Sequence, residues 1–212
     1  MRYLLLGILF LTSTVFAQSD QKSKEILDKI STEIKGLKSF YMEFDMSSKN
    51  SSTGENTNQK GTGYVKGNKY FATLGDLTLI SNGVKSWTVI KDEKMTYQND
   101  VDEDDDDAIT PKKLMTIWEK GFKSKYEKET TINGKKVHQI SLFPTNPGKV
   151  NYHTITLFVG VQGNDLYRAI MKTKDGGVMT YTIGKLDKTA TVADSKFVYN
   201  PQNYPGYQLI RD

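Results

Sequence analysis

The clearest pattern in the chain is an alternation of apolar and polar residues over positions 40–46. Four apolar side chains fall on one face of an extended chain, those of Phe40, Met42, Phe44 and Met46. A period of two predicts a half-buried β-strand. The apolar face carries Phe and Met where strands usually carry Val and Ile, and unbranched Met adapts to partners of variable shape. Two interpretations follow: the face packs an ordinary core, or it lines a cavity for a flexible apolar ligand such as an acyl chain.

A helical pattern precedes this strand. Over residues 19–35 the apolar positions recur at intervals of one, three or four residues, and Ser19 or Asp20 is suited to cap the first turn. The predicted helix ends at Gly36. Its apolar stripe consists of Ile26, Leu27, Ile30, Ile34 and Leu37.

A second amphipathic helix is predicted over residues 111–120. Thr110 is suited to cap it, Pro111 fits the first helical position, and Gly121 ends it. Its apolar face carries Leu114, Met115, Ile117 and Trp118. Both helices have an apolar side that needs a surface to cover.

Turn signals between short apolar runs predict the rest of the fold. Pairs of Gly with Asn or Asp supply the positive φ that tight hairpins need. They occur at residues 67–68, 82–83, 133–134, 163–164 and 175–177. Their spacing predicts an up-and-down meander of about ten or eleven strands, as in β-barrels and sandwiches. We therefore expect a mainly β fold in which a half-open sheet carries two helices as a lid.

Composition narrows the possible partners. The chain has 212 residues and a net charge of +4, without a dense Lys/Arg stripe interleaved with aromatics, so nucleic acid is not an expected partner. It has no cysteine, which excludes disulfides, a thiol nucleophile and a lipid-modified cysteine. Residues 99–107 are strongly acidic. We interpret this run as a solvated loop; a docking surface for a basic partner or a weak cation site is the alternative, although the ligand spacing of a calcium loop is missing.

The first 17 residues have the pattern of a cleavable signal peptide. Arg2 precedes an apolar run over residues 3–15, and a small residue, Ala17, ends the segment. The run is short for a membrane span. We expect residues 18–212 to be a single exported domain, located in the periplasm of a Gram-negative cell and without a permanent membrane anchor.

Several segments, in this order and spacing, resemble the periplasmic outer-membrane lipoprotein carrier protein LolA family. Each segment alone is a weak signal, and their succession along nearly the whole mature chain is fairly specific. They are residues 26–30 and 37–44 (first helix and strand), 61–66 with 70–71 (second hairpin), 79–83 with Trp87, 110–115 (the Pro-Leu helix), 140–144 (the Leu-x-Pro strand end) and 194–199 (a near-terminal strand).

The resemblance implies an incomplete antiparallel β-barrel with a helical lid over an apolar cavity. Such a carrier shields the acyl chains of lipoproteins between an inner-membrane release transporter and an outer-membrane acceptor, as a monomer and without a cofactor or metal. On this basis we predict acyl-chain contacts from Phe40, Met42, Phe44, Met46, Phe71, Leu79, Trp87, Leu114, Met115, Ile117 and Trp118. The lid residues are Ile26, Leu27, Ile30 and Ile34.

The chain departs from the family at the turn of the second hairpin. Many members have an Arg there that latches the lid, whereas this chain has Gly67 between Lys66 and Lys69. A lysine at either position is the available substitute, but its ammonium group lacks the planar fork of a guanidinium. The latch is therefore an open question.

Enzymatic chemistry is not expected. The two histidines, His138 and His153, are not at metal-ligand spacing, and neither a nucleophile elbow nor a phosphate loop occurs. His138 shares its strand face with Ile140 and Leu142, as a satisfied core histidine does. Two non-enzymatic alternatives remain: a carrier or sensor for another lipid on the same fold, and a cargo-free periplasmic interaction module.

Overall fold

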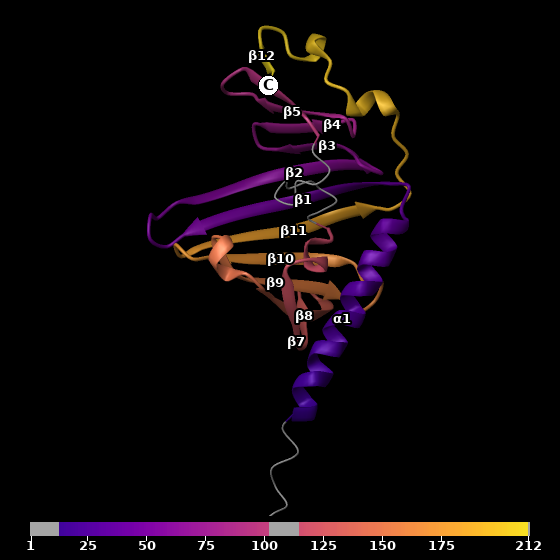
Figure 1. The fold of residues 1–212 in the computed structure, drawn as a ribbon, viewed down its shortest axis with the longest axis vertical. Helices are drawn as coiled ribbons and strands as arrows, with labels where there is room; N and C mark the ends of the chain where they lie inside the picture. The colour runs from indigo at the N-terminus through magenta and orange to yellow at the C-terminus, as the bar shows by residue number, and fades with distance from the viewer. Residues whose placement is uncertain (1–12, 102–114, 212) are drawn as a thin grey trace, which may run out of the picture.

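The computed structural model describes residues 13–101 and 115–211, and side chains from Asp20 onward. Within them it contains one α-helix, twelve strands and four short 3-10 helices (Figure 1). The elements are α1 Ser13–Gly36, β1 Ser39–Asn50, β2 Asn56–Lys66, β3 Lys69–Leu74, β4 Leu77–Ser81, β5 Lys85–Ile90, β6 Met95–Asp100, η1 Ile117–Glu119, β7 Phe122–Ile132, β8 Lys135–Pro144, η2 Pro147–Lys149, β9 Tyr152–Gly160, β10 Leu166–Thr173, β11 Gly177–Asp187, η3 Asp194–Phe197, η4 Pro201–Asn203 and β12 Gln208–Arg211.

All twelve strands form one open sheet. Their order is β12-β6-β5-β4-β3-β2-β1-β11-β10-β9-β8-β7, so the sheet has two free edges and does not close into a barrel. Neighbours are antiparallel except for β12, which runs parallel to β6 with Gln208 opposite Met95. The predicted half-open antiparallel sheet is confirmed, and β12 raises the strand count above the ten or eleven expected. The near-terminal strand expected at residues 194–199 is instead the 3-10 helix η3 and the turn after it.

The sheet has two differently covered faces. Residues directly opposite each other on paired strands share a face, and faces alternate along each strand. Met42, Gly63, Ala72 and Leu79 are paired in succession across β1–β4 and lie on the side of α1. We call this side the helix face. The other side, which the segment from η3 to β12 covers over β3–β6, is called the tail face.

Helix α1 buries its apolar stripe on the helix face. The stripe packs with β1 and with β8 and β9, which lie next to the edge strand β7 (Figure 1). All four predicted lid residues are buried, namely Ile26, Leu27, Ile30 and Ile34. The amphipathic helix predicted from residue 19 is therefore confirmed, and in the structure it begins earlier, at Ser13.

The second predicted helix is only partly covered by the described residues. Residues 111–114 lie outside them, as does the acidic run at 102–107. From residue 115 onward the chain forms a turn and η1, a single 3-10 turn at Ile117–Glu119, in place of the predicted α-helix. Its Trp118 is buried beneath α1, so the apolar face still points into the core.

Aromatic stacking attaches the C-terminal segment to the tail face. The ring centroids of Trp87 and Tyr199 are 6.3 Å apart, and those of Tyr199 and Tyr204 are 5.2 Å apart, both in stacked geometry. The hydroxyl of Thr96 donates to the Tyr199 hydroxyl at 3.3 Å. Together with Ile80 and Val89 these side chains form a second hydrophobic cluster, separate from the one beneath α1. The sheet thus has two cores, one on each face.

Candidate functional site

The structure brings together most of the predicted acyl-chain residues beneath α1. Phe40, Met42, Met115 and Trp118 are buried in the helix-face cluster, and Phe44 and Ile117 pack against it partly exposed. They converge because the period-two face of β1 and the 115–118 turn both meet the apolar stripe of the helix. Two further residues, Met46 and Leu79, lie on the same face outside this cluster, Met46 buried and Leu79 half-buried. Leu114 is outside the described residues.

Phe71 and Trp87 lie on the other face of the sheet. Phe71 is paired with Tyr64 and Ile80, and Ile80 with Trp87, so all four side chains are on the tail face. There they pack with the C-terminal segment, and the ammonium group of Lys196 lies 3.9 Å from the Phe71 ring centroid. The structure therefore separates these two residues from the eight other described residues that were predicted to line one cavity.

The space between α1 and the sheet is filled by the protein's own side chains. Ile140, Leu142 and Leu157 on β8 and β9 are 0 % exposed, and Ile30 of the helix is 2 % exposed. Side chains at this level of burial leave no room for an acyl chain unless they move. The region beneath the helix is consequently a packed core in this structure.

Beside α1, the helix face carries an apolar strip across β3–β6 whose residues belong to neither hydrophobic cluster. One row across the sheet continues from Phe44 through Gly61, Leu74, Leu77 and Ile90 to Met95. The next row continues from Met42 through Gly63, Ala72, Leu79 and Thr88 to Tyr97. The side chains of β3–β6 in these rows are half-buried, except buried Ala72. The strip therefore leads from the packed core onto accessible apolar surface.

Of this strip, the sequence-based site included only Leu79. The missed residues are Leu74, Leu77, Ile90, Met95 and Tyr97. Each lies in a strand too short to show a convincing period of two, so the face of its side chain depends on the pairing register. That register was the missing signal.

Two glycines in β2 make room for the large side chains of β1. A Cβ atom at Gly61 would lie 2.2 Å from Cζ of Phe44, and one at Gly63 would lie 3.4 Å from Cγ of Met42. The Phe44 ring therefore lies directly over the backbone of β2. This fit places the ring at the boundary between the packed core and the apolar strip.

A small set of polar contacts fixes α1 over the sheet. Trp118 donates from Nε1 to Oγ of Ser31 at 2.8 Å, and both side chains are buried. At the other end of the helix, the hydroxyls of Ser23 and Ser124 are hydrogen-bonded at 2.8 Å. Lys35 also forms an ion pair with Glu119 at 2.7 Å. These contacts involve neither residue 67 nor its neighbours.

The lysines of the second-hairpin turn hold the C-terminal segment, not the helix. Lys66 and Lys69 contact the carboxylate of Asp194 at 2.9 and 3.3 Å. Hydrogen bonds from Lys66 and then Lys69 lower the pKa of that carboxyl. Gly67 occupies the turn between them with a φ of +59°, a conformation that favours glycine. The suggestion that either lysine replaces the lid-latching Arg is not supported by these contacts.

The two histidines lie in different surroundings, and His153 is hydrogen-bonded at 2.9 Å to the hydroxyl of its neighbour Thr154. His138 lies 3.3 Å from the Tyr126 hydroxyl and 3.6 Å from Glu129, and burial lowers its pKa. Among the described residues no group of three or more His, Asp or Glu side chains is arranged to hold a metal ion. His138 faces the same side as Ile140, as expected for a core histidine.

Comparisons with known proteins place this geometry in a family. No curated protein matches the sequence. An uncharacterized conserved protein from Thermus thermophilus has a similar structure, with a TM-score of 0.61 and 8% identity over 91% of this chain and 100% of that chain. LprF from Mycobacterium bovis has a TM-score of 0.49 and 15% sequence identity over 82% of this chain and 96% of that chain. A LolA superfamily protein from Nitrosomonas europaea has a TM-score of 0.44 and 12% sequence identity over 84% of this chain and 97% of that chain.

The Thermus structure shows that the fold recurs in another protein at very low sequence identity. The assignment of this chain comes from its own sequence, because residues 13–157 match the model of the family described as outer membrane lipoprotein carrier protein LolA. This match spans the helix, the apolar strip and most of the packed core. The chain belongs to the outer membrane lipoprotein carrier protein LolA family.

Proposed function

We propose that this protein binds the acyl chains of lipoproteins and carries them across the periplasm. In this proposal the cargo is received from an inner-membrane release transporter and passed to an outer-membrane acceptor. Family membership supports a lipid- or lipoprotein-binding role. The transport direction, the two membrane partners and the monomeric state are parts of the proposal that rest on the family alone.

The apolar strip beside α1 is the observation that carries the proposal. Its two rows extend from Phe44 and Met42 across β2 to Met95 and Tyr97 on β6. Five strand spacings of about 4.8 Å give it a length of about 24 Å. An acyl chain lying along these rows would exchange water for apolar contacts at about 0.8 kcal/mol for each buried methylene.

The strip also suits a carrier that must release its cargo. Leu, Ile, Met and Tyr side chains make contacts without a fixed direction, and flexible Met95 adapts to chains of different length. Such contacts hold a chain in proportion to its buried area. An acceptor that buries more of the chain therefore takes it over.

Export is part of the same proposal. We place the signal peptide at residues 1–17, of which residues 1–12 lie outside the described residues. The bond after Ala17 falls within α1, whose apolar stripe starts well after it. Removal of residues 1–17 therefore leaves the apolar stripe from Ile26 onward in place. In the described part of the chain, no helix combines the length and apolar character that a membrane span requires.

A binding measurement with matched variants tests the acyl-chain site. The probe is a fluorescent acylated lipopeptide, with the same peptide lacking acyl chains as the reference. Leu79→Asp places a charge on the strip, and we expect it to weaken binding at least tenfold, since an unpaired carboxylate against an acyl chain is strongly unfavourable. The control is Ile170→Asp, a half-buried apolar residue on the tail face of β10.

The result that counts against the proposal is specific. Equal affinity of Leu79→Asp and the unaltered protein, with both folded by circular dichroism, would exclude the strip as the binding surface. Comparison of the lipopeptide with a free fatty acid separates a lipoprotein carrier from a carrier of other lipids.

A further inference from the structure

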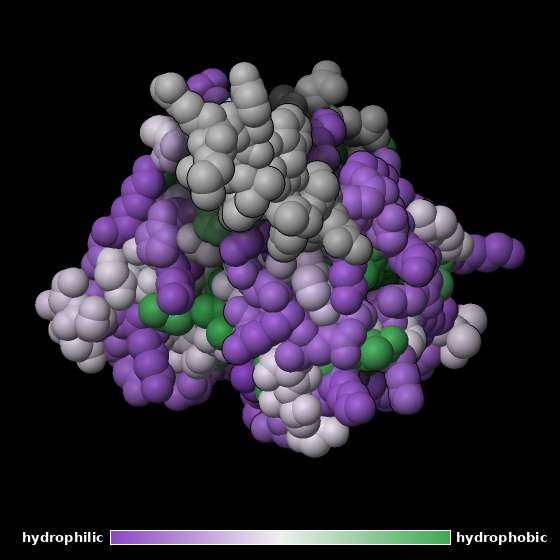
Figure 2. Space-filling model, turned by 90° about the horizontal axis from the view of Figure 1, so that it is seen from below, coloured by the Kyte–Doolittle hydropathy of each residue, from purple (hydrophilic) through white to green (hydrophobic). Residues whose placement is uncertain are grey.

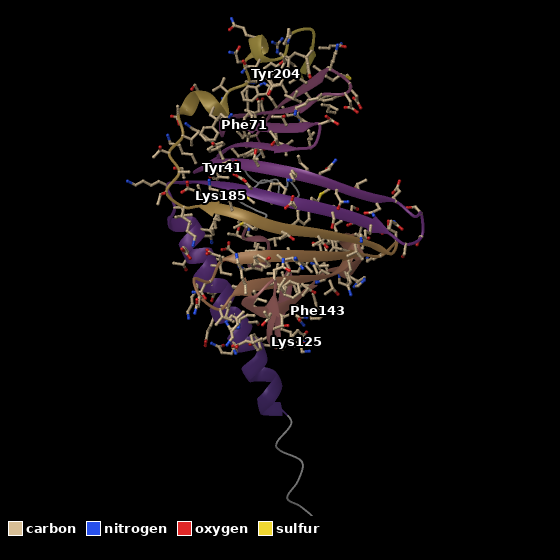
Figure 3. All side chains as sticks on the ribbon, turned by 180° about the vertical axis from the view of Figure 1, so that it is seen from behind. Tyr41, Phe71, Lys125, Phe143, Lys185 and Tyr204 are labelled. Atoms are coloured by element: carbon tan, nitrogen blue, oxygen red, sulfur yellow. The ribbon has the colours of Figure 1, made fainter. Side chains whose placement is uncertain are left out.

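The tail face of the sheet has a second surface that the C-terminal segment does not cover. It spans seven neighbouring strands, β7-β8-β9-β10-β11-β1-β2. The register aligns its side chains in rows across these strands, for example Lys125–Ser141–Thr156–Ile170–Thr180–Ser47–Asn58. We call it the basic sheet face. In Figure 3 the labelled residues Lys125 and Phe143 mark its β7–β8 side, at the opposite end of the sheet from Phe71 and Tyr204.

Positive charge is concentrated on this surface. The three rows that cross all seven strands contain seven basic side chains, those of Lys49, Lys60, Lys123, Lys125, Lys128, Arg168 and Lys172, and one acidic side chain, that of Asp45; Glu127 lies beside them at the bulge of β7. Beyond these rows, Glu43 on the same side is opposite Lys185. This excess is larger than the net charge of +4 of the whole chain. Among the residues that the structure describes, only Lys125 of the seven forms an ion pair, with Glu127 at 2.9 Å. Of the other six, Arg168 donates from Nε to Oγ1 of Thr182 at 3.2 Å. The five lysines are available to an external anion.

Apolar side chains lie between these charges. Phe143 is 41 % exposed and is opposite Lys123. Ile170 and Val178, on β10 and β11, are both half-buried. At the β2 side the face contains a depression of about 400 Å³. Lys60, Thr180 and Thr182 line it and offer hydrogen-bond donors to phosphate oxygens, and Asp45 lines it as well, beside Lys60 on the neighbouring strand.

We infer that the basic sheet face docks the protein on the surface of a membrane that contains anionic phospholipids. Six strand spacings give the face a length of about 29 Å, enough to contact many headgroups at once. Lysines at an anionic membrane surface attract it, and their methylene stems lie along apolar neighbours while the ammonium groups reach the phosphates. Phe143 is placed to enter the boundary between headgroups and acyl chains.

The same observations argue against a nucleic acid as the partner. A sheet that binds single strands presents several exposed rings on which bases stack. In the three rows that cross all seven strands, the ring besides Phe143 is that of Phe158, which is 9 % exposed. The half-buried rings of Tyr41 and Tyr64 on the same side pack against each other, with centroids 4.5 Å apart. Figure 2 shows the molecule from below, where the surface that is not grey is mainly hydrophilic with separate hydrophobic patches.

Docking on this face is independent of the proposed acyl-chain site, because that site lies on the helix face. A protein docked in this way would hold its acyl-chain strip away from the membrane plane. Each function can therefore fail in an experiment without the other.

Vesicle flotation tests the inference. The full chain, exported by a Gram-negative host and checked by mass spectrometry for its N-terminus, is mixed with vesicles of phosphatidylglycerol and phosphatidylcholine or of phosphatidylcholine alone. We expect flotation with the anionic vesicles and a decrease as salt is raised. Each lysine near such a surface contributes about a fivefold factor in affinity, so Lys123→Gln, Lys128→Gln and Lys172→Gln combined should weaken binding on the order of 100-fold.

A second triple variant is the matched control. Lys29→Gln, Lys38→Gln and Lys91→Gln remove the same charge from positions outside the basic sheet face, and we expect affinity to remain within about twofold of the unaltered protein. All variants share one N-terminus, so any retained apolar residues of 3–15 contribute equally.

Three outcomes would overturn the inference. They are equal losses in the two triple variants, flotation that does not depend on phosphatidylglycerol, and binding to soluble heparin without binding to vesicles. Phe143→Ser is expected to lower the binding that remains at high salt, and an unchanged value would remove Phe143 from the docking surface. Lipopeptide binding by the same variants should stay at the level of the unaltered protein.

Discussion

A disulfide between α1 and β7 would decide whether the helix must move for cargo to bind. Ser23 on the helix and Ser124 on β7 are hydrogen-bonded with their Oγ atoms 2.8 Å apart, and they are 101 positions apart in the sequence. The chain has no cysteine, so the double substitution Ser23→Cys and Ser124→Cys introduces a single pair of thiols. Oxidation of this pair fixes the helix to the sheet, while reduction frees it.

The structure allows the alternatives to be compared in energy. Seating a chain beneath α1 requires the four buried residues of its stripe to leave the core, namely Ile26, Leu27, Ile30 and Ile34. At about 1.5–3 kcal/mol each, this costs about 6–12 kcal/mol, which is comparable with the whole stability of a domain. The strip beside the helix is accessible without that cost. We therefore expect cargo to bind with α1 in place.

The assay compares lipopeptide affinity in the oxidised and reduced double variant, with Ser23→Cys alone as the control for the redox treatment. We expect the two affinities to agree within about twofold, and the oxidised form to be more stable by up to about 4.7 kcal/mol from the closed loop. Loss of more than tenfold in affinity on oxidation, with recovery on reduction, would refute the reasoning. It would show that the helix acts as a movable lid.

Particular contacts support three more predictions. Gly61→Ala places a methyl group against the ring of Phe44, and we expect the free energy of unfolding, measured in urea, to fall by about 1–3 kcal/mol. Adding Phe44→Leu to the same chain should make this loss smaller. An unchanged unfolding midpoint for Gly61→Ala would show that the ring moves freely. The folded-state pKa of Asp194 is lowered by two lysines, so its contribution is complete above the ordinary value of 3.8 and is lost as pH falls through the lower folded-state pKa. Protection of the C-terminal segment against hydrogen exchange, taken relative to the intrinsic exchange rate at each pH, should therefore fall in acid, and Asp194→Asn should remove this pH dependence. A dependence that persists would assign it to another group. Trp118, buried beneath α1, and Trp87, on the tail face, should both keep their fluorescence on lipopeptide binding, as read from Trp→Phe variants. A change at Trp118 would place the ligand beneath the helix, and a change at Trp87 would place it on the tail face.

The sequence predicted the elements of the fold better than their pairing. The alternation at residues 40–46 identified β1 and its buried side, and the spacing of Ile26, Leu27, Ile30 and Ile34 identified the buried stripe of α1. Both patterns are long enough to show their period. Asn133 and Gly134, both with positive φ, likewise form the predicted turn between β7 and β8. These features are local, so the local sequence determines them.

The acyl-chain site depended on information that is not local. Phe71 and Ala72 are adjacent in β3, and which of them faces α1 depends on the register of β3 with β2. Composition favoured the large aromatic residue for an apolar cavity, yet the register places small Ala72 on the helix face and Phe71 beneath the C-terminal segment. Family resemblance could not correct this, because a motif gives the succession of residues without stating which element covers each face.

The coverage of the two faces explains how one alternating sequence serves two purposes. On β3–β6 the tail face is closed by Tyr199 and Tyr204, whose stacked rings complete a core with Trp87. That core stabilises these strands without help from the helix face. The helix-face residues of the same strands, such as Leu79 and Met95, are consequently not required to pack with α1. A sheet stabilised from behind can keep an apolar surface in front for a ligand, and this is the physical basis on which the strip is assigned to acyl chains.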